Sequence, residues 1–364
     1  MGHSCRLLLV LLLIPFPAFS GQSTAPPQLR PRPPAALKEP PGGTGHRITL
    51  DVQVADRSHE AVHGLQQQDF TVLDDGKPQD ILSFIAVNGG MPSTTALPIE
   101  LVLVIDAVNT PFDSLTYERG EVKKFLLQNG GQLPLPVSLI IFSDAGTKVQ
   151  NAASRDGKVL AALYEQYEFR LRDITRSQGF HGATERFDTS LKTLNSLAEY
   201  EKSRPGRKLM IWFSPGWPML SGSGVQLSHH DQRYLFNSIV VLSSALRQAR
   251  ITLYSIDPLG LADAGGIRME YYKEFLDGIT SPSQAVAGDL GLQVLAIQSG
   301  GRVFNGGIDL PTAIRSCAAD ADAFYALSFD ARPANEADQY HSLTVVVNKP
   351  GITVRTRTGY YAQP

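Results

Sequence analysis

The sequence predicts an α/β protein with a doubly wound, mostly parallel sheet, inserted in a small β-sandwich formed by both chain ends. Between residues 98 and 322, short apolar runs alternate with helical patterns, which is typical of βαβ crossovers. Residues 46–95 and 323–362 instead show the two-residue alternation of half-buried strands. Each β-rich end alone is too short to be stable in water, so we expect the two ends to pair in space.

The first twenty residues predict export. A basic start, MGHSCR, precedes the apolar run LLLVLLLI, and small residues at Ala18 and Ser20 suggest cleavage near residue 20. A short N-terminal anchor is the alternative. Residues 21–45 are Pro-rich and predict an extended linker. We therefore expect a secreted or periplasmic protein, with no transmembrane segment in the mature chain.

The net charge of −2 gives no reason to expect nucleic acid as a partner. In the first β-rich part, RITLDVQV alternates apolar and polar residues, and Asp75-Gly76 signals a turn between two further strands. In the last part, a hairpin is predicted around Pro350-Gly351. These patterns divide the chain into a first sandwich part, a central α/β domain and a second sandwich part.

The central domain begins with IELVLVID, a continuous apolar run of the kind found in strands buried on both faces. It predicts a parallel strand that ends at Asp106. Further strands are expected at 137–144, 207–214, 250–257 and 301–304, and helices at 115–129, 155–170, 187–203, 231–249, 288–299 and 310–321.

Three loops should meet where ligands bind in open α/β sheets, at the carboxyl ends of the strands. The first loop runs from Asp106 to Thr110. The second is GFHGATERFD at 179–188, before the helix predicted from residue 187. The third is Ser214-Pro215-Gly216-Trp217.

An exported α/β domain whose first strand ends in a carboxylate resembles a von Willebrand factor type A domain. The segments on either side of this domain make the resemblance more specific. They are GLQQQDFTVLDDGKPQDILSF (64–84) before it, and AFYALSFDARP followed by LTVVVNKPGITVRTRTGYYA (323–362) after it. They are similar to segments of the exported "VWFA-related" bacterial proteins that are abundant in acidobacteria. The resemblance covers residues 46–362. It implies a non-catalytic adhesion module of the bacterial envelope with a protein partner.

The wider family often carries a metal-ion-dependent adhesion site, in which oxygen ligands hold Mg²⁺ or Mn²⁺. By this resemblance Asp106 matches the first ligand, Thr110 the second hydroxyl and Thr184 the threonine of the second loop. Val108 stands where a serine is expected, and Ser214 where an aspartate is expected. The resemblance therefore implies a degenerate site with weak affinity for Mg²⁺ or Mn²⁺, and no other cofactor.

The same stretch has a structural interpretation, which we favour. Thr110 can cap the helix that follows, with Pro111 in its first position and Asp113 in its first turn. Asp106 can then accept N–H bonds from the turn. Thr184 can equally cap its own helix.

Further candidates for contact with a partner are Asn109, His181, Ser214 and Trp217, the last only if it is exposed. The leading hypothesis is recognition of an unidentified protein without catalysis. A hydrolase using Asp106 and a neighbouring histidine is one alternative, and a structural envelope protein with no active site is another. A His or Glu side chain within hydrogen-bond reach of Asp106 would favour catalysis.

Overall fold

The computed structural model describes residues 47–88, 98–167, 179–218, 227–258, 271–306 and 308–362. The predicted signal sequence and the Pro-rich linker lie outside the described residues. Within those ranges, no helix combines the length and the apolar character needed to cross a membrane.

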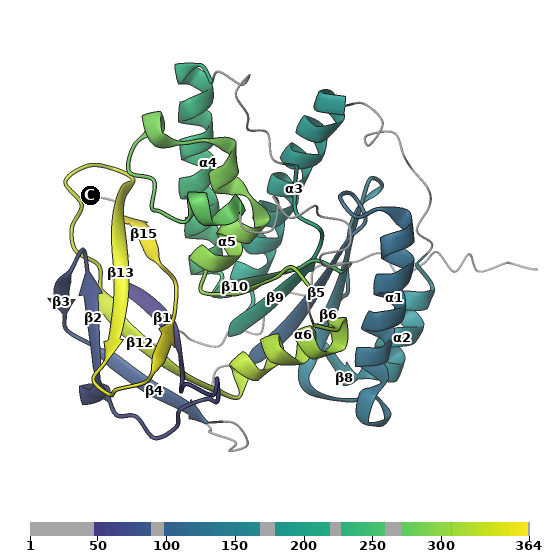
Figure 1. Ribbon diagram of the computed structural model, residues 1–364, viewed down its shortest axis with the longest axis horizontal. Coiled ribbons are helices and arrows are strands. Elements are labelled where there is room, and N and C mark those ends of the chain that lie inside the picture. The colour runs from purple at the N-terminus through teal and green to yellow at the C-terminus, as the bar shows by residue number, and fades with distance from the viewer. Residues whose placement is uncertain are drawn as a thin grey trace, which may run out of the picture. The chain divides into compact units, whose positions relative to one another are not determined.

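A mostly parallel sheet forms the centre of the α/β domain (Figure 1). Its strand order is β11-β10-β9-β5-β6-β7, and β8 pairs with β6. The contacts between β11, β10, β9, β5 and β6 are parallel, whereas β7 and β8 are antiparallel to β6. The strands are β5 (Ile99–Asp106), β6 (Gln132–Ser143), β7 (Gly146–Val149), β8 (Ser154–Asp156), β9 (Arg207–Phe213), β10 (Ile251–Ile256) and β11 (Val303–Phe304).

Helices cover both faces of this sheet because its central strands are apolar on both sides. In β5, Val102 and Val104 join one hydrophobic cluster, and Leu103 and Ile105 join the other. The first cluster is built with α3 (Gly179–Lys202), α4 (His229–Gln248) and α5 (Leu292–Gln298). The second is built with α1 (Phe112–Leu127), α2 (Gly157–Glu165) and α6 (Leu310–Ala318). The prediction of a mixed α/β fold with a mostly parallel central sheet is confirmed.

Two antiparallel four-stranded sheets draw strands from both ends of the described chain, in the orders β14-β1-β12-β4 and β15-β13-β2-β3. Their apolar faces form one cluster that includes Val52, Val72, Leu327 and Val345. The strands are β1 (Arg47–Ala55), β2 (Phe70–Asp74), β3 (Lys77–Gln79), β4 (Ser83–Asn88), β12 (Ala323–Asp330), β13 (Gln339–Val347), β14 (Thr353–Arg355) and β15 (Gly359–Ala362).

Short 3₁₀ helices complete the described secondary structure. They are η1 (Gln67–Asp69), η2 (Gln128–Gly131), η4 (Tyr271–Phe275), η5 (Pro282–Gln284), η6 (Ala287–Leu290) and η7 (Ala319–Ala321).

Ion pairs and one aromatic contact join the antiparallel sheets to the α/β domain. Asp51 of β1 lies 2.6 Å from Arg250 and 3.5 Å from Arg207, which begins β9. Tyr361 of β15 packs edge-on against Phe236 of α4, with ring centroids 6.1 Å apart. Because Tyr361 also belongs to the cluster under α3, α4 and α5, part of the core is shared.

Candidate binding site at the strand tips

The order of the parallel strands reverses at β5. The chain passes from β5 to β6 on one side and then returns to β9 on the other side of β5. Ligands of open α/β sheets bind at the carboxyl end of such a reversal. Asp106 is the last residue of β5 and therefore lies at the position where the fold itself favours a binding site.

Four hydrogen bonds hold the buried Asp106 carboxylate. Oδ1 accepts from the backbone N–H groups of Val108 (3.0 Å) and Asn109 (2.9 Å). Oδ2 accepts from Asn109 Nδ2 (2.8 Å) and from the indole Nε1 of Trp212 (2.9 Å). The side chain is 0% exposed. A carboxylate offers about four lone-pair directions, so protein donors already occupy all of them.

Burial raises the pKa of Asp106 above its ordinary value. Hydrogen bonds from Trp212 and Asn109, together with the nearby Ser214 hydroxyl, act in the opposite direction, because they stabilise the charged form. A metal ion at Asp106 would have to displace at least one of these donors. The local geometry is that of a strand-to-helix turn that satisfies the Asp106 carboxylate, while Asn109 Oδ1 is buried without a hydrogen-bond partner among the described residues.

The start of α1 differs from the predicted cap. The N-cap position is Pro111, with φ −59° and ψ 150°, and no side chain caps the helix; α1 begins at Phe112. Thr110 therefore lies one residue before the cap and is fully buried, and its N–H donates to the Asp106 carbonyl at 3.2 Å. The prediction of Thr110 as N-cap is wrong by one position, a shift within the usual uncertainty of helix ends.

The second loop is not a loop. Residues 179–188 form the first turns of α3, so Thr184 is a partly buried residue inside the helix and not its N-cap. His181 is exposed in the first turn. Farther along α3, the Ser190 hydroxyl accepts a hydrogen bond from Asn109 Nδ2 at 2.9 Å. Asn109 thus links the Asp106 turn to α3, and it is the one predicted contact residue that the described bonds join to Asp106 directly.

The third loop turns inward. Ser214 is fully buried, and its hydroxyl accepts from the Gly216 N–H at 3.2 Å. Trp217 is only 4% exposed and packs edge-on against Trp212, with ring centroids 5.4 Å apart. Trp217 is a candidate contact only on the condition that it is exposed, and this condition is not met: the side chain is core, and it supports the indole that donates to Asp106.

A second buried acid beside Asp106 escaped the sequence analysis. Glu118 of α1 is 0% exposed, and neither of its carboxyl oxygens has a hydrogen-bond partner among the described residues. Burial raises its pKa well above the ordinary value, and the nearby charge of Asp106 raises it further. Helical periodicity places position 118 on the inner face of α1, but nothing in the pattern distinguishes a buried acid from a solvated one.

Known proteins give little further information. No protein-family model matches the sequence. No curated protein matches it either.

Among solved structures, the chain is similar to the pilus adhesin SpaC from Lactobacillus rhamnosus GG, with 12% identity and a TM-score of 0.36 over 81% of this chain and 41% of the adhesin. It is also similar to the SpRpn10 VWA domain, with 11% identity and a TM-score of 0.25 over 60% of this chain and 94% of that domain. For the human COPII-coat protein Sec24c the values are 8% identity and a TM-score of 0.34, over 73% of this chain and 44% of that protein. The chain thus spans less than half of the adhesin and of the coat protein. At such TM-scores, the likenesses assign no activity or partner.

Proposed function

We propose that this chain is a non-catalytic binding module of the von Willebrand A type. In this proposal it acts outside the cytoplasm and recognises a protein partner with the carboxyl edge of its parallel sheet. The observation that supports the proposal best is the state of Asp106. A buried acid with four protein donors is suited to fixing the shape of a binding edge, and poorly suited to acting as a base or nucleophile.

The groups around Asp106 weigh against the hydrolase alternative. Within the described part of the chain, its carboxylate accepts hydrogen bonds from Val108, Asn109 and Trp212, the Ser214 hydroxyl lies nearby, and no His or Glu is among these groups. Asp106 is near enough to raise the pKa of Glu118, but Glu118 is itself fully buried. A reacting group would need access to substrate, which neither acid has in this arrangement.

Exposed side chains at this edge are the proposed contacts. Phe112, the first residue of α1, is 41% exposed directly after the strand-tip turn. His181 is exposed in the first turn of α3. Both helices begin at the carboxyl edge of the sheet, because α1 follows β5 and α3 leads back into β9. An aromatic contact surrounded by polar groups is typical of residues that dominate protein interfaces.

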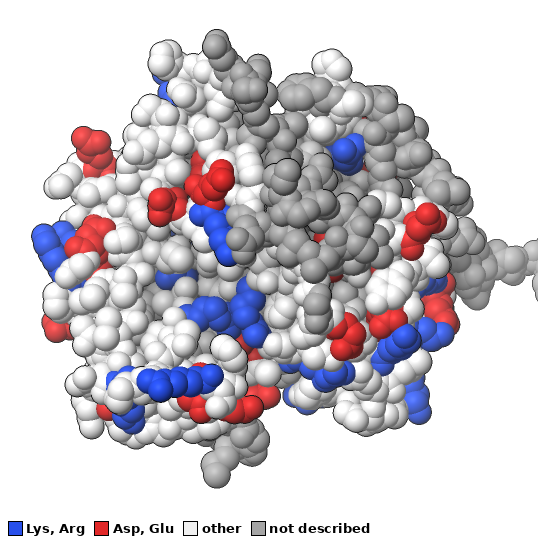
Figure 2. Space-filling model, in the orientation of Figure 1, with Lys and Arg blue, Asp and Glu red and all other residues white. Residues whose placement is uncertain are grey.

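The surface charge fits a protein partner better than a nucleic acid. In Figure 2, acidic and basic side chains are interspersed over the visible face, and neither sign covers it. The whole chain carries a net charge of −2. A nucleic-acid surface would need a continuous basic field.

Site-specific photo-crosslinking tests the proposal. A photoreactive phenylalanine analogue replaces Phe112 in one sample and Val241 in the other. Val241 is 52% exposed on α4, so it serves as a matched control. With the extracytoplasmic fraction of the host cells, we expect a discrete protein adduct from position 112 and none from position 241. We also expect the adduct to persist in a metal chelator, since Asp106 is already occupied by protein donors.

The other outcomes contradict the proposal in different ways. Equal adducts from both positions would show nonspecific contact. No adduct from position 112 would favour a structural envelope protein. An adduct that requires Mg²⁺ or Mn²⁺ would restore a functional metal-ion-dependent site at Asp106.

A further inference from the structure

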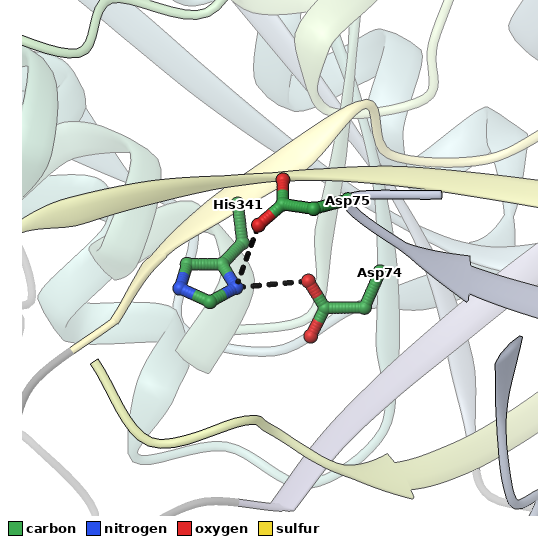
Figure 3. A group of neighbouring side chains, drawn as sticks. All are labelled: Asp74, Asp75 and His341. Atoms are coloured by element: carbon green, nitrogen blue, oxygen red, sulfur yellow. Dashed lines mark hydrogen bonds and ion pairs between the residues drawn. The ribbon is translucent and has the colours of Figure 1, made fainter. Parts of the chain in front are cut away.

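A polar cluster lies in the sheet β15-β13-β2-β3, which is separate from the parallel sheet that ends at Asp106. Asp74 ends β2, Asp75 begins the turn to β3, and His341 belongs to β13 (Figure 3). The pairing of Leu343 with Asp74 fixes the register of β13 on β2. On the other side of β13, His341 is paired with Tyr360 of β15. The cluster therefore joins strands from both ends of the chain.

The imidazole faces both carboxylates through a single nitrogen. His341 Nδ1 lies 2.8 Å from Asp74 Oδ1 and 3.3 Å from Asp75 Oδ2. His341 and Asp74 are 1% and 0% exposed, and the Asp75 side chain is 37% exposed. The other ring nitrogen, Nε2, is buried and has no hydrogen-bond partner among the described residues. Nδ1 is thus the nitrogen through which this ring makes its polar contacts.

Other protein donors hold the far oxygen of each carboxylate. The Tyr360 hydroxyl donates to Asp74 Oδ2 at 2.8 Å, and the Ser342 N–H donates to Asp75 Oδ1 at 2.9 Å. The Tyr360 ring stacks on His341, with centroids 5.1 Å apart. These contacts orient one oxygen of each acid and the imidazole nitrogen toward a common point. Outer hydrogen bonds of this kind orient the ligands in metal sites.

We propose that Asp74 Oδ1, Asp75 Oδ2 and His341 Nδ1 bind a divalent transition-metal ion such as Zn²⁺. One imidazole with two carboxylates is a ligand set that suits Zn²⁺, and affinity for Mn²⁺ should be lower by the Irving–Williams order. Ligands about 2.1 Å from one ion lie about 3 Å apart when the angle between them is about 90°. The two measured separations to Nδ1 are close to this value.

The negative charge of the two carboxylates favours binding of a divalent cation. With a neutral imidazole, the cluster holds two carboxylates, and the guanidinium of Arg332 lies 3.9 Å from Asp75 Oδ2. A doubly charged ion would neutralise both acids, and the neutral imidazole would bind it through a deprotonated Nδ1 with its single proton on Nε2. The exposed Asp75 side chain leaves a path for entry and space for a water molecule to complete the coordination. Such an ion would link the Asp75 turn to His341 of β13.

Calorimetric titration of the full chain tests the site. After a chelator has removed metal and has itself been removed, Zn²⁺ is titrated into the wild type, Asp75→Asn and Asp80→Asn. Asp80 is an exposed acid just beyond β3 and serves as the matched control. We expect one saturable Zn²⁺ event in the wild type and in Asp80→Asn, weakened at least about tenfold in Asp75→Asn, as expected for the loss of one metal ligand. Sites elsewhere in the chain would appear equally in all three.

Thermal unfolding gives a second readout that does not depend on heat of binding. A Zn²⁺ concentration that saturates the wild type should raise the unfolding midpoint of the wild type and of Asp80→Asn by about 3 °C, and should raise that of Asp75→Asn clearly less. Because the Asp75 side chain is partly exposed, this variant should fold. Zn²⁺ binding of equal strength in the wild type and Asp75→Asn, or no saturable binding in either, would overturn the proposal.

Discussion

Asp106 accepts four hydrogen bonds at the end of β5, and its replacement should lower the stability of the folded protein by a measurable amount. In Asp106→Asn, one oxygen can still accept from the turn, but the new amide group faces Trp212 Nε1 and Asn109 Nδ2, which are both donors. Leaving them unpaired should lower the free energy of unfolding by about 2–4 kcal/mol. Urea denaturation of the variant and the wild type measures the difference.

Asp113→Asn is the control for this substitution. Asp113 is an exposed acid in the first turn of α1, and the loss of its charge should cost about 0.3–1 kcal/mol. An Asp106→Asn variant no less stable than Asp113→Asn would mean that the four hydrogen bonds contribute little.

The buried Glu118 predicts an unusual pH dependence of the free energy of unfolding. Its pKa in the folded protein is raised well above the ordinary value of 4.5, first by burial and then by the charge of Asp106. The folded state therefore keeps a proton that the unfolded state loses, so stability is highest below the unfolded pKa and falls as pH rises toward the folded pKa. In Glu118→Gln this loss disappears.

The measurement is urea unfolding at several pH values from 5 upward. Relative to Glu118→Gln, the wild type should lose up to about 1.4 kcal/mol of unfolding free energy for each pH unit in that window. Parallel stability profiles of the two proteins would show that Glu118 is ionised or solvated in the folded state.

Single residues near the site were only partly predictable. Asp106 could be placed at a strand end because the apolar run before it is unambiguous, and its N–H bonds from the turn follow from local geometry. The indole of Trp212 could not be predicted as a donor, since it depends on how β9 lies beside β5. His341 lies 267 positions from Asp74, so only the strand register joins them.

At the scale of elements, the loop after β9 gives a direct spectroscopic prediction. The chain contains 2 tryptophans, and both are buried: Trp212 is 0% and Trp217 is 4% exposed. The fluorescence of the folded protein should therefore be blue-shifted and nearly insensitive to iodide, and urea should make it sensitive. A quenchable fraction near one half in the folded protein would place Trp217 in solvent, as the exposed-rim hypothesis required.

The start of α3 shows why some element boundaries resist prediction. Gly179 and Gly182 have low helix propensity, which favours a loop over residues 179–188. In the folded chain Gly182 is buried, Phe187 joins the core and Ser190 bonds to Asn109. Tertiary packing thus extends the helix through a segment whose local preference is weak.

At the scale of the whole molecule, the alternation of strand and helix patterns predicts the parallel sheet and its two helical layers well. The contacts between the chain ends are less accessible to sequence analysis, because they depend on side chains that meet only after both parts have folded. Asp51 is the clearest case. From β1 it reaches Arg207 and Arg250, which flank β9 and β10 of the α/β domain.

Asp51→Asn should therefore weaken the connection between the antiparallel sheets and the α/β domain. Arg207 is only 1% exposed and Arg250 19%, so the substitution leaves two cations without their carboxylate. Removing one partner of a buried ion pair typically costs about 3–5 kcal/mol, and partial exposure of Arg250 places the expected loss near about 3 kcal/mol. Scanning calorimetry should show a lower midpoint and, as the coupling weakens, two separate transitions.

Asp330→Asn provides the comparison within the same sheet. Asp330 pairs with Arg47 at 3.0 Å, but the two side chains are 50% and 42% exposed, so water screens the interaction and its loss should cost less than about 1 kcal/mol. If Asp51→Asn and Asp330→Asn unfold alike, the Asp51 pairs do not couple the two parts. If only Asp51→Asn separates the transitions, the shared core around Tyr361 cannot by itself make the two parts unfold together. Ion pairs as well as apolar packing then hold the α/β domain to the antiparallel sheets.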